Sequence, residues 1–203
     1  MGTYLGASEK LVFNPEFIVI ANDSKILFSE GYQFTSQENY SAFLEILKGT
    51  NLATKFALSL SDPGVVSGFR DRFTEVFSVR KVDYLFCNKE EATALVGENF
   101  IDALKDVAIN YVVTNGSESS YVMEGDNYAE IEARKVKAID SNGAGDIFAG
   151  AALHKVIEGK SFIDACKFGN YASSIIVQEK SPRLSVEAYK KLKADYSKAE
   201  SDS

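Results

Sequence analysis

Short apolar segments typical of β-strands alternate with amphipathic segments typical of helices along most of the chain. The helical segments carry start and stop signals: Thr35 or Ser36 is suited to begin one of them, and Gly49 to end it. Because helical crossovers are the usual connections between parallel strands, this alternation predicts an α/β fold with a mainly parallel sheet. The segments that we interpret as strands are "KILFSEGYQF" (25–34), "KFALSLS" (55–61), "VDYLFCN" (82–88) and "NYVVTNG" (110–116).

The second half of the chain begins with a predicted β-hairpin. Residues 119–133, "SSYVMEGDNYAEIEA", suggest two strands around a turn at Gly125 and Asp126. Two helical segments follow, and the polar tail 191–203 is expected to fray. Since no internal repeat or interdomain linker is present, we predict a single domain over residues 1–203.

Composition and charge argue against several classes of partner. The formal net charge is -7 and no long Lys/Arg cluster is present, so a nucleic acid is not expected as a partner. No apolar run reaches membrane-spanning length, and the first residues lack a signal-peptide pattern, so no membrane association is expected. The two cysteines, Cys87 and Cys166, form no C-x-x-C pair, which suits a reducing compartment. We therefore expect a cytoplasmic protein.

A loop with two glycines and two carboxylates precedes one of the later helices. Ile139 is followed by "DSNGAGD", residues 140–146, before the apolar pattern resumes. If a helix starts near Gly145, its first N–H groups lack partners within the helix and form an anion hole. The carboxylate of Asp146 could then accept a proton from a hydroxyl, as transfer of a phosphoryl group to an alcohol requires. The alternative is that Asp146 is only a helix-terminal carboxylate and that the glycines form only a turn.

Longer segments help to decide between these two interpretations, because they resemble the motifs of a known family. The segment "DSNGAGDIFAGAAL" resembles the D-T-x-G-A-G-D-x-F-x-G signature of the ribokinase-like (PfkB) carbohydrate kinase family, with Ser141 in place of the usual Thr. The resemblance leans toward the adenosine-kinase-like branch and implies a three-layer sandwich, with a mainly parallel sheet flanked by helices. Further segments similar to the family are "TYLGAS", "LFSEGYQF", "CNKEEATAL", "VVTNGSESS" and "GNYASSIIVQEKSPRL".

The resemblance implies catalytic roles for one segment of the chain. Asp146 would be the base that deprotonates the acceptor hydroxyl. The backbone of Gly143, Ala144 and Gly145 would form the anion hole around the transferred phosphate. Asp140 would help to hold a K⁺-like ion that orders this loop.

The resemblance also implies a nucleotide site with a metal ion. Asn88 and Glu91 would organise Mg²⁺ and its waters around the ATP phosphates, which suits the preference of Mg²⁺ for oxygen ligands and water. Thr114, Gly116 and Asn170 would line the nucleotide site. Taken singly, these residues are better explained by a helix N-cap with a surface carboxylate, a strand-end turn and a helix-surface amide.

The family's acceptor-binding and lid segments have no counterpart in this sequence. We therefore expect the chain to be the C-terminal, nucleotide-binding portion of such a kinase, N-terminally incomplete. A sheet edge would then be exposed, and we expect the chain to be poorly stable or to form a homo-oligomer that covers this edge. Asp62, before Pro63, is at a strand end where substrate or Mg²⁺ could bind, although a turn-initiating role suits an Asp-Pro pair better.

Three functional hypotheses follow. The first is an ATP-dependent kinase that transfers the γ-phosphoryl group to a hydroxyl of a sugar or nucleoside. The second is a non-catalytic nucleotide-binding or interaction module, motivated by the missing acceptor site. The third, a dinucleotide-dependent oxidoreductase, is disfavoured because no glycine-rich turn follows the first predicted strand.

Overall fold

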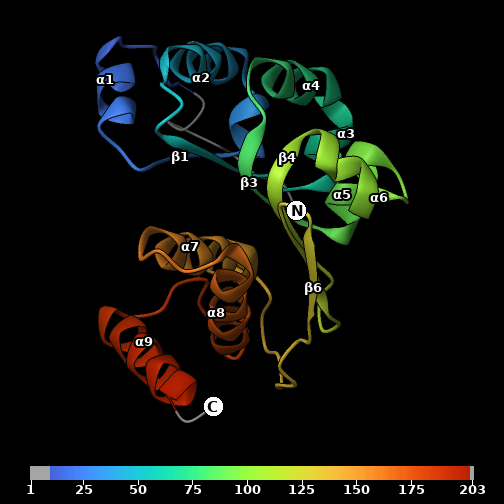
Figure 1. Ribbon diagram of the computed structural model, residues 1–203, viewed down its shortest axis with the longest axis vertical. Helices are drawn as coiled ribbons and strands as arrows, with labels where there is room; N and C mark the ends of the chain where they lie inside the picture. Colours follow the sequence, from blue (N-terminus) through green and yellow to red (C-terminus); the bar gives the residue numbers. More distant parts are fainter. Residues whose placement is uncertain (1–9, 202–203) are drawn as a thin grey trace. The chain divides into compact units, whose positions relative to one another are not determined.

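The computed structural model describes residues 10–201 (Figure 1). The segment "TYLGAS", residues 3–8, lies outside the described residues. Within them, strands and helices alternate as the sequence predicts. The helices are α1 Glu16–Asn22, α2 Gln37–Gly49, α3 Pro63–Gly68, α4 Arg70–Val79, α5 Lys89–Val96, α6 Phe100–Ala103, α7 Ala144–Ile157, α8 Phe162–Ile176 and α9 Val186–Ser201, with 3₁₀ turns η2 Gly31–Phe34 and η3 Leu104–Asp106.

Strands of the described residues form one sheet in the order β1-β2-β3-β4-β5-β6. The β1–β2 and β2–β3 pairs are parallel, whereas β5 and β6 form an antiparallel hairpin. This arrangement confirms the predicted mainly parallel sheet with flanking helices. The strand bounds are β1 Ile26–Glu30, β2 Lys55–Ser59, β3 Val82–Asn88, β4 Ala108–Thr114, β5 Ser120–Glu124 and β6 Asn127–Ile131.

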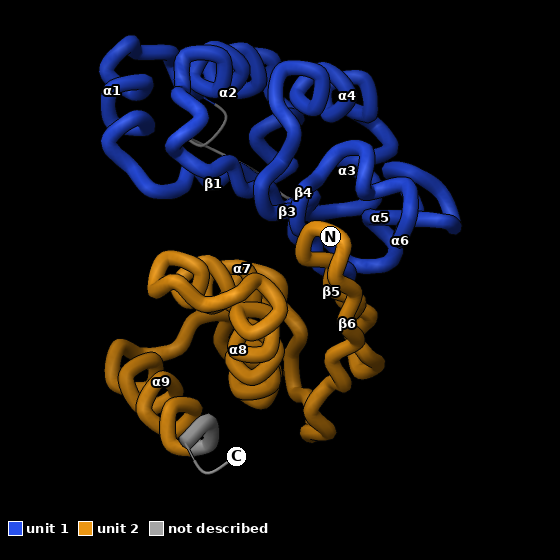
Figure 2. The backbone as a smooth tube through the Cα atoms, in the orientation of Figure 1, with its two compact units in different colours: residues 1–113 blue, residues 114–203 orange. Residues whose placement is uncertain are grey.

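The chain divides into two compact units, residues 1–113 and 114–203 (Figure 2). The prediction of a single domain over residues 1–203 is not tested by this division and stays a prediction. Residues 191–201 belong to helix α9, and the fraying expected of the tail also stays a prediction.

An aromatic cluster forms much of the core in the first unit. The ring of Phe34 contacts those of Tyr40, Phe43 and Phe73, with ring centroids 5.9, 5.4 and 4.8 Å away. Phe34 and Phe73 are fully buried. Edge-to-face and tilted contacts of this kind add to the free energy gained by removing the rings from water. The cluster fixes η2 and helices α2 and α4 against each other.

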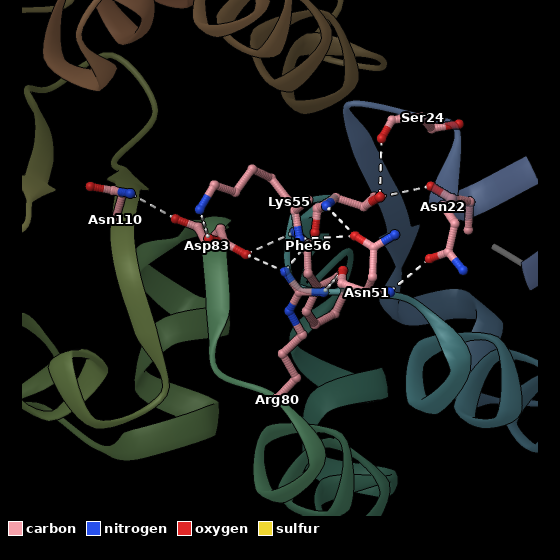
Figure 3. Close-up of polar contacts among 11 residues, drawn as sticks. Asn22, Ser24, Asn51, Lys55, Phe56, Arg80, Asp83 and Asn110 are labelled. Atoms are coloured by element: carbon pink, nitrogen blue, oxygen red, sulfur yellow. Dashed lines mark hydrogen bonds and ion pairs between the residues drawn. The ribbon is translucent and has the colours of Figure 1, made fainter.

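Asp83 joins the amino ends of the neighbouring strands in the same unit (Figure 3). Its buried carboxylate accepts hydrogen bonds from the backbone N–H of Phe56 at 2.9 Å and from Lys55 Nζ at 2.9 Å. Arg80 contacts the second carboxylate oxygen at 3.0 Å and also donates to the Thr54 carbonyl at 2.6 Å. Because a buried carboxylate is costly without partners, these contacts fix the start of β3 beside the start of β2.

Helices α7 and α8 pack closely in the second unit. A Cβ added at Gly169 would lie 2.9 Å from the carbonyl oxygen of Phe148, so only glycine fits at this approach without a shift. The β5–β6 hairpin is tied to α8, because the Glu124 carboxylate accepts hydrogen bonds from the N–H groups of Phe162 at 2.8 Å and Ile163 at 3.3 Å. These contacts orient α8, which in turn supports the start of α7.

Local structure departs from the sequence expectations most clearly in two places. The strand expected over 25–34 ends at Glu30, and η2 follows, because the Phe34 side chain enters the aromatic cluster instead of continuing the strand direction. Helix α1 was not predicted from the sequence. Its first turn is supported by Asn14 Oδ1, which accepts a hydrogen bond from the Glu16 N–H at 3.0 Å.

Candidate functional site

Gly143 directly precedes helix α7 in a conformation that glycine alone adopts easily. Its φ of 78° and ψ of 0° lie in the left-handed region. A Cβ added there would lie 2.6 Å from the carbonyl oxygen of Pro182, so the segment after α8 presses directly on this residue. Both the backbone conformation and the close approach therefore require glycine at position 143.

The first turn of α7 presents N–H groups that have no partner in the part of the chain that the structure describes. The Ala144 N–H donates to the Ser141 carbonyl at 3.2 Å, and the Ile147 N–H donates to the Gly143 carbonyl at 3.0 Å. Among the described residues, no acceptor bonds the N–H of Gly145 or Asp146. A Cβ added at Gly145 would meet nothing within 4 Å, so no described atom crowds the Cβ side of this residue. Such a helix start is suited to bind an anion.

The Asp146 side chain is exposed on the same first turn. No hydrogen bond or ion pair engages its carboxylate within residues 10–201. A carboxylate in this place is available to accept a proton from a bound molecule. Its position agrees with the sequence prediction, although the helix begins one residue earlier than expected, at Ala144.

Asp140 orders the loop that leads to α7. Its carboxylate accepts the backbone N–H of Asn142 at 2.9 Å, which forms a tight local turn. The N–H groups of Ile139 and Asp140 both donate to the Val177 carbonyl, at 2.6 and 3.2 Å. The loop is thus held by the end of α8. These contacts explain the position of Asp140 without a cation.

The predicted nucleotide residues lie at three places in the second unit. Thr114 ends β4, and Gly116 follows in a turn with a φ of 59°, closed by a 2.9 Å hydrogen bond from the Glu118 N–H to the Asn115 carbonyl. Asn170 lies on α8, where its amide donates to the Glu132 carbonyl at 2.8 Å. The Asn170 amide therefore ties α8 to the segment after β6.

Asn88 and Glu91 are joined in the first unit as a capping box at the start of α5. Glu91 Oε2 accepts the backbone N–H of Asn88 at 3.0 Å, and Glu91 Oε1 accepts from Asn88 Nδ2 at 2.8 Å. Asn88 Oδ1 in return accepts the Glu91 N–H at 2.8 Å. Glu91 is buried, with 6% of its surface exposed, so the interpretation as a surface carboxylate is wrong.

The surroundings of Glu91 disfavour its ionised form. Burial raises the pKa of Glu91 to about 7, and the negative charges of Asp62 and Glu90 act in the same direction, whereas the hydrogen bond from Asn88 lowers it. A positive charge nearby would stabilise the carboxylate. Its two oxygens also keep lone pairs beyond those used by Asn88. The residues present therefore fit a hydrated Mg²⁺ held through water.

Asp62 caps helix α3. Its Oδ1 accepts hydrogen bonds from the N–H groups of Gly64 at 2.7 Å and Val65 at 3.0 Å. The turn-initiating interpretation of the Asp-Pro pair is thus confirmed. The preceding residue, Ser61, has a φ of 72°, an unusual backbone conformation for a side chain that is not glycine. No sequence signal marked Ser61.

Sequence reasoning also missed two contacts that shape the start of α7. One is the approach of Pro182 to Gly143, and the other is the hydrogen bond from Ser173 Oγ to the Ala144 carbonyl at 2.8 Å. Both join segments that are about 30 or more residues apart, so no local pattern could reveal them. Within residues 10–201, no group of three or more His, Cys, Asp or Glu side chains could hold a metal ion. No helix in the described part of the chain has the length and apolarity needed to cross a membrane.

Comparison with known proteins identifies relatives of this chain. The model of the pfkB family carbohydrate kinases matches residues 3–188. Adenosine kinase 1 of Arabidopsis thaliana is 27% identical over 184 aligned residues, covering 81% of this chain and 52% of that protein. Ribokinase of Lactococcus lactis subsp. lactis (strain IL1403) is 31% identical over 137 aligned residues, covering 66% of this chain and 46% of that protein.

A solved structure gives the same assignment. The adenosine kinase of Sinorhizobium meliloti matches with a TM-score of 0.80 at 28% sequence identity, over 90% of this chain and 59% of that chain. This similarity confirms the expected ribokinase-like fold. The chain spans about half the length of the curated relatives that it matches. From the match over residues 3–188, this chain belongs to the pfkB family of carbohydrate kinases.

Proposed function

We propose that the protein transfers the γ-phosphoryl group of ATP to a hydroxyl of a sugar or nucleoside. The observation that carries this proposal is the start of α7, where the unpartnered N–H groups of Gly145 and Asp146 share one turn with the Asp146 carboxylate. An anion-binding helix start beside an available base is the combination that phosphoryl transfer to an alcohol needs. Family membership supports the same reaction class.

The backbone of Gly143, Ala144 and Gly145 would bind the transferred phosphoryl group. Its oxygens carry negative charge throughout transfer, and N–H groups fixed at a helix start stabilise that charge without reorganising. The left-handed Gly143 sets the direction in which the helix begins, and thereby the direction of these N–H groups. Their role is electrostatic, and no covalent bond to the protein is formed.

Asp146 would act as the general base. Its carboxylate accepts the proton of the acceptor hydroxyl while the hydroxyl oxygen forms a bond to the γ-phosphorus. The bond between the γ-phosphorus and the bridging oxygen breaks at the same time, and that electron pair leaves with ADP. A general base of this kind contributes roughly 10²–10⁴ in rate.

Asn88 and Glu91 would hold Mg²⁺ through water on the ATP phosphates. When bound, Mg²⁺ supplies positive charge that offsets the charge of the phosphate oxygens. The contribution of the chain is the buried Glu91 carboxylate, fixed by Asn88 and ready to accept hydrogen bonds from metal-bound water. Asp140 remains our candidate for a K⁺-like ion. Its carboxylate is engaged by Asn142, and a role in ordering the α7 loop fits this contact.

The adenine and ribose of ATP would bind near Thr114, Gly116 and Asn170, with cytoplasmic ATP as the donor. The exposed, left-handed turn at Gly116 offers backbone groups to a ligand. Asn170 keeps its carbonyl oxygen for a ligand while its amide is bound to Glu132. A homo-oligomer that covers the sheet edge remains part of the proposal.

The test is phosphoryl transfer by the purified protein, with ATP, Mg²⁺ and a panel containing adenosine and ribose. Asp146→Asn is expected to lower kcat by about 10²–10⁴-fold, because the base is lost, while ATP analogue binding measured by calorimetry is retained. Glu91→Gln is expected to weaken binding of the Mg²⁺ complex of the analogue. The exposed Asp126→Asn in the hairpin turn serves as a control for loss of one surface carboxylate. Binding without turnover of any acceptor would favour the non-catalytic module, which family membership does not favour.

A further inference from the structure

One side chain of α8 reaches across to the first turn of α7. Ser173 Oγ donates a hydrogen bond to the Ala144 carbonyl at 2.8 Å. Serine hydroxyls inside helices commonly bond a carbonyl three or four residues earlier in their own helix. Ser173 instead bonds a carbonyl of a different helix, 29 residues away in sequence.

The register of the two helices makes this contact specific. Ala144 lies opposite Ser173, and Phe148, four residues later, lies opposite Gly169, four residues earlier. The helices therefore run antiparallel with matching turns. Because Gly169 allows the backbones to approach, the short Ser173 side chain reaches the Ala144 carbonyl.

The carbonyl that Ser173 contacts shares a peptide plane with the Gly145 N–H. In a planar trans peptide the carbonyl of Ala144 and the N–H of Gly145 point in opposite directions. A hydrogen bond to the carbonyl fixes this plane and polarises the peptide, so that its N–H becomes a stronger donor. The Gly145 N–H has no acceptor among the described residues.

We propose that Ser173 is a positioning residue for phosphoryl transfer, acting on the transferred group through the Ala144–Gly145 peptide. This inference rests on the proposed kinase function. Ser173 contacts neither ATP nor the acceptor in this scheme. Its hydroxyl orients and strengthens one of the N–H donors that would face the phosphoryl charge. The contribution of this donor grows as the reaction approaches the transition state.

Ser174 provides a matched control in the next position of the same helix. It is buried, and its hydroxyl donates to the Tyr171 carbonyl at 2.7 Å, within its own helix. Ser174→Ala and Ser173→Ala each remove one helix hydroxyl. Only Ser173→Ala removes a hydrogen bond to the Ala144–Gly145 peptide.

The first measurement is steady-state kinetics of the proteins with ATP, Mg²⁺ and the acceptor. Ser173→Ala is expected to lower kcat about 5–10-fold, less than the 10²–10³ expected for losing a whole donor, with the KM values for ATP and acceptor nearly unchanged. Ser173→Thr, which keeps the hydroxyl, is expected to restore most of kcat. Ser174→Ala is expected to keep the wild-type kcat. Equal kcat values for Ser173→Ala and Ser174→Ala would overturn the proposal while leaving the kinase function intact.

The second measurement does not depend on turnover. The ¹H–¹⁵N resonance of Gly145 is followed in each protein, alone and during titration with inorganic phosphate. We expect an upfield shift of the Gly145 amide proton and weaker phosphate binding in Ser173→Ala but not in Ser174→Ala. If the wild-type protein phosphorylates no acceptor, that result contradicts the kinase proposal. The chemical shift of the Gly145 amide then tests by itself whether Ser173 positions the Ala144–Gly145 peptide. An unchanged Gly145 resonance in Ser173→Ala would refute this positioning role.

Discussion

Both carboxylate oxygens of Glu91 accept hydrogen bonds from Asn88, one from its backbone N–H and one from its side-chain amide. The reciprocal bond from the Glu91 N–H closes the capping box at the start of α5. These contacts fix the orientation of a buried carboxylate whose charge has no ion-pair partner among the described residues. Asn88 and Glu91 therefore form a local helix-capping motif, and the same two side chains are the candidate cation-binding group.

The first prediction concerns the pH dependence of stability through Glu91. The folded pKa of about 7 lies above the ordinary value of 4.5, so folding favours the protonated form. The stabilising contribution is fully present below pH 4.5 and is lost as pH rises through 7. At about 1.4 kcal/mol per pKa unit, the change amounts to at most about 3.5 kcal/mol.

This contribution is measured by comparing wild type and Glu91→Gln in EDTA, by thermal unfolding from pH 5 to 8. The unfolding free energy of wild type relative to Glu91→Gln should fall as pH rises to 7 and then level off. Glutamine cannot accept both hydrogen bonds from Asn88, so a constant offset between the two proteins is expected. A difference that does not vary with pH would show that the pKa of Glu91 is not raised.

The second prediction concerns Gly143→Ala. The left-handed conformation costs an L-residue about 1–2 kcal/mol, and the added Cβ would also clash with the Pro182 carbonyl. We expect a loss of stability above 2 kcal/mol and a fall in turnover of at least about 10-fold, since the direction of the α7 N–H groups changes.

Gly159→Ala separates the two causes. Gly159 has a φ of 88°, but an added Cβ would meet nothing within 4 Å. It should therefore show only the conformational cost, with unchanged kcat. Equal effects of the two substitutions on stability and turnover would mean that the contact with Pro182 does not matter.

The third prediction compares a buried and an exposed ion pair. Asp83→Ala leaves the guanidinium of Arg80, whose side chain is 9% exposed, without its carboxylate partner. Breaking a buried pair in this way is expected to cost about 3–5 kcal/mol. Asp102→Ala breaks the exposed pair with Lys105 and should cost about 1 kcal/mol or less. Chemical unfolding measures both values, and a similar small cost for both would contradict a structural role of the Asp83 network.

The fourth prediction tests the close packing of α7 and α8. Gly169→Ala places a methyl group 2.9 Å from the Phe148 carbonyl oxygen, so the helices must separate, at a cost of about 1–3 kcal/mol. Gly150→Ala, where a Cβ meets nothing, should instead stabilise α7 by up to about 1 kcal/mol through helix propensity. Thermal unfolding distinguishes the two, and a stabilising Gly169→Ala would show that the approach at Phe148 is not tight.

The sequence predicted well the features that depend on short segments. The turn at Gly125–Asp126 and the N-cap at Ser36 are specified by neighbouring residues and by backbone chemistry, and both are present in the structure. The glycine loop likewise indicated a helix start at which N–H groups lack partners, because two glycines and an aspartate within four residues are a local signal. The resemblance to the family signature also predicted the ribokinase-like fold, since the spacing of that signature reflects a whole α/β unit.

Tertiary structure alone decided the environment of each site residue. Glu91 belongs to a local N-x-x-E pattern, but its raised pKa comes from burial and from Asp62, which is 29 positions earlier in the chain. The requirement for glycine at position 143 depends on Pro182, and the orientation of the Ala144–Gly145 peptide depends on Ser173. Local sequence sets backbone conformation and hydrogen-bonding capacity. Burial, electrostatic field and close contact arise between distant segments, and only packing brings those segments together.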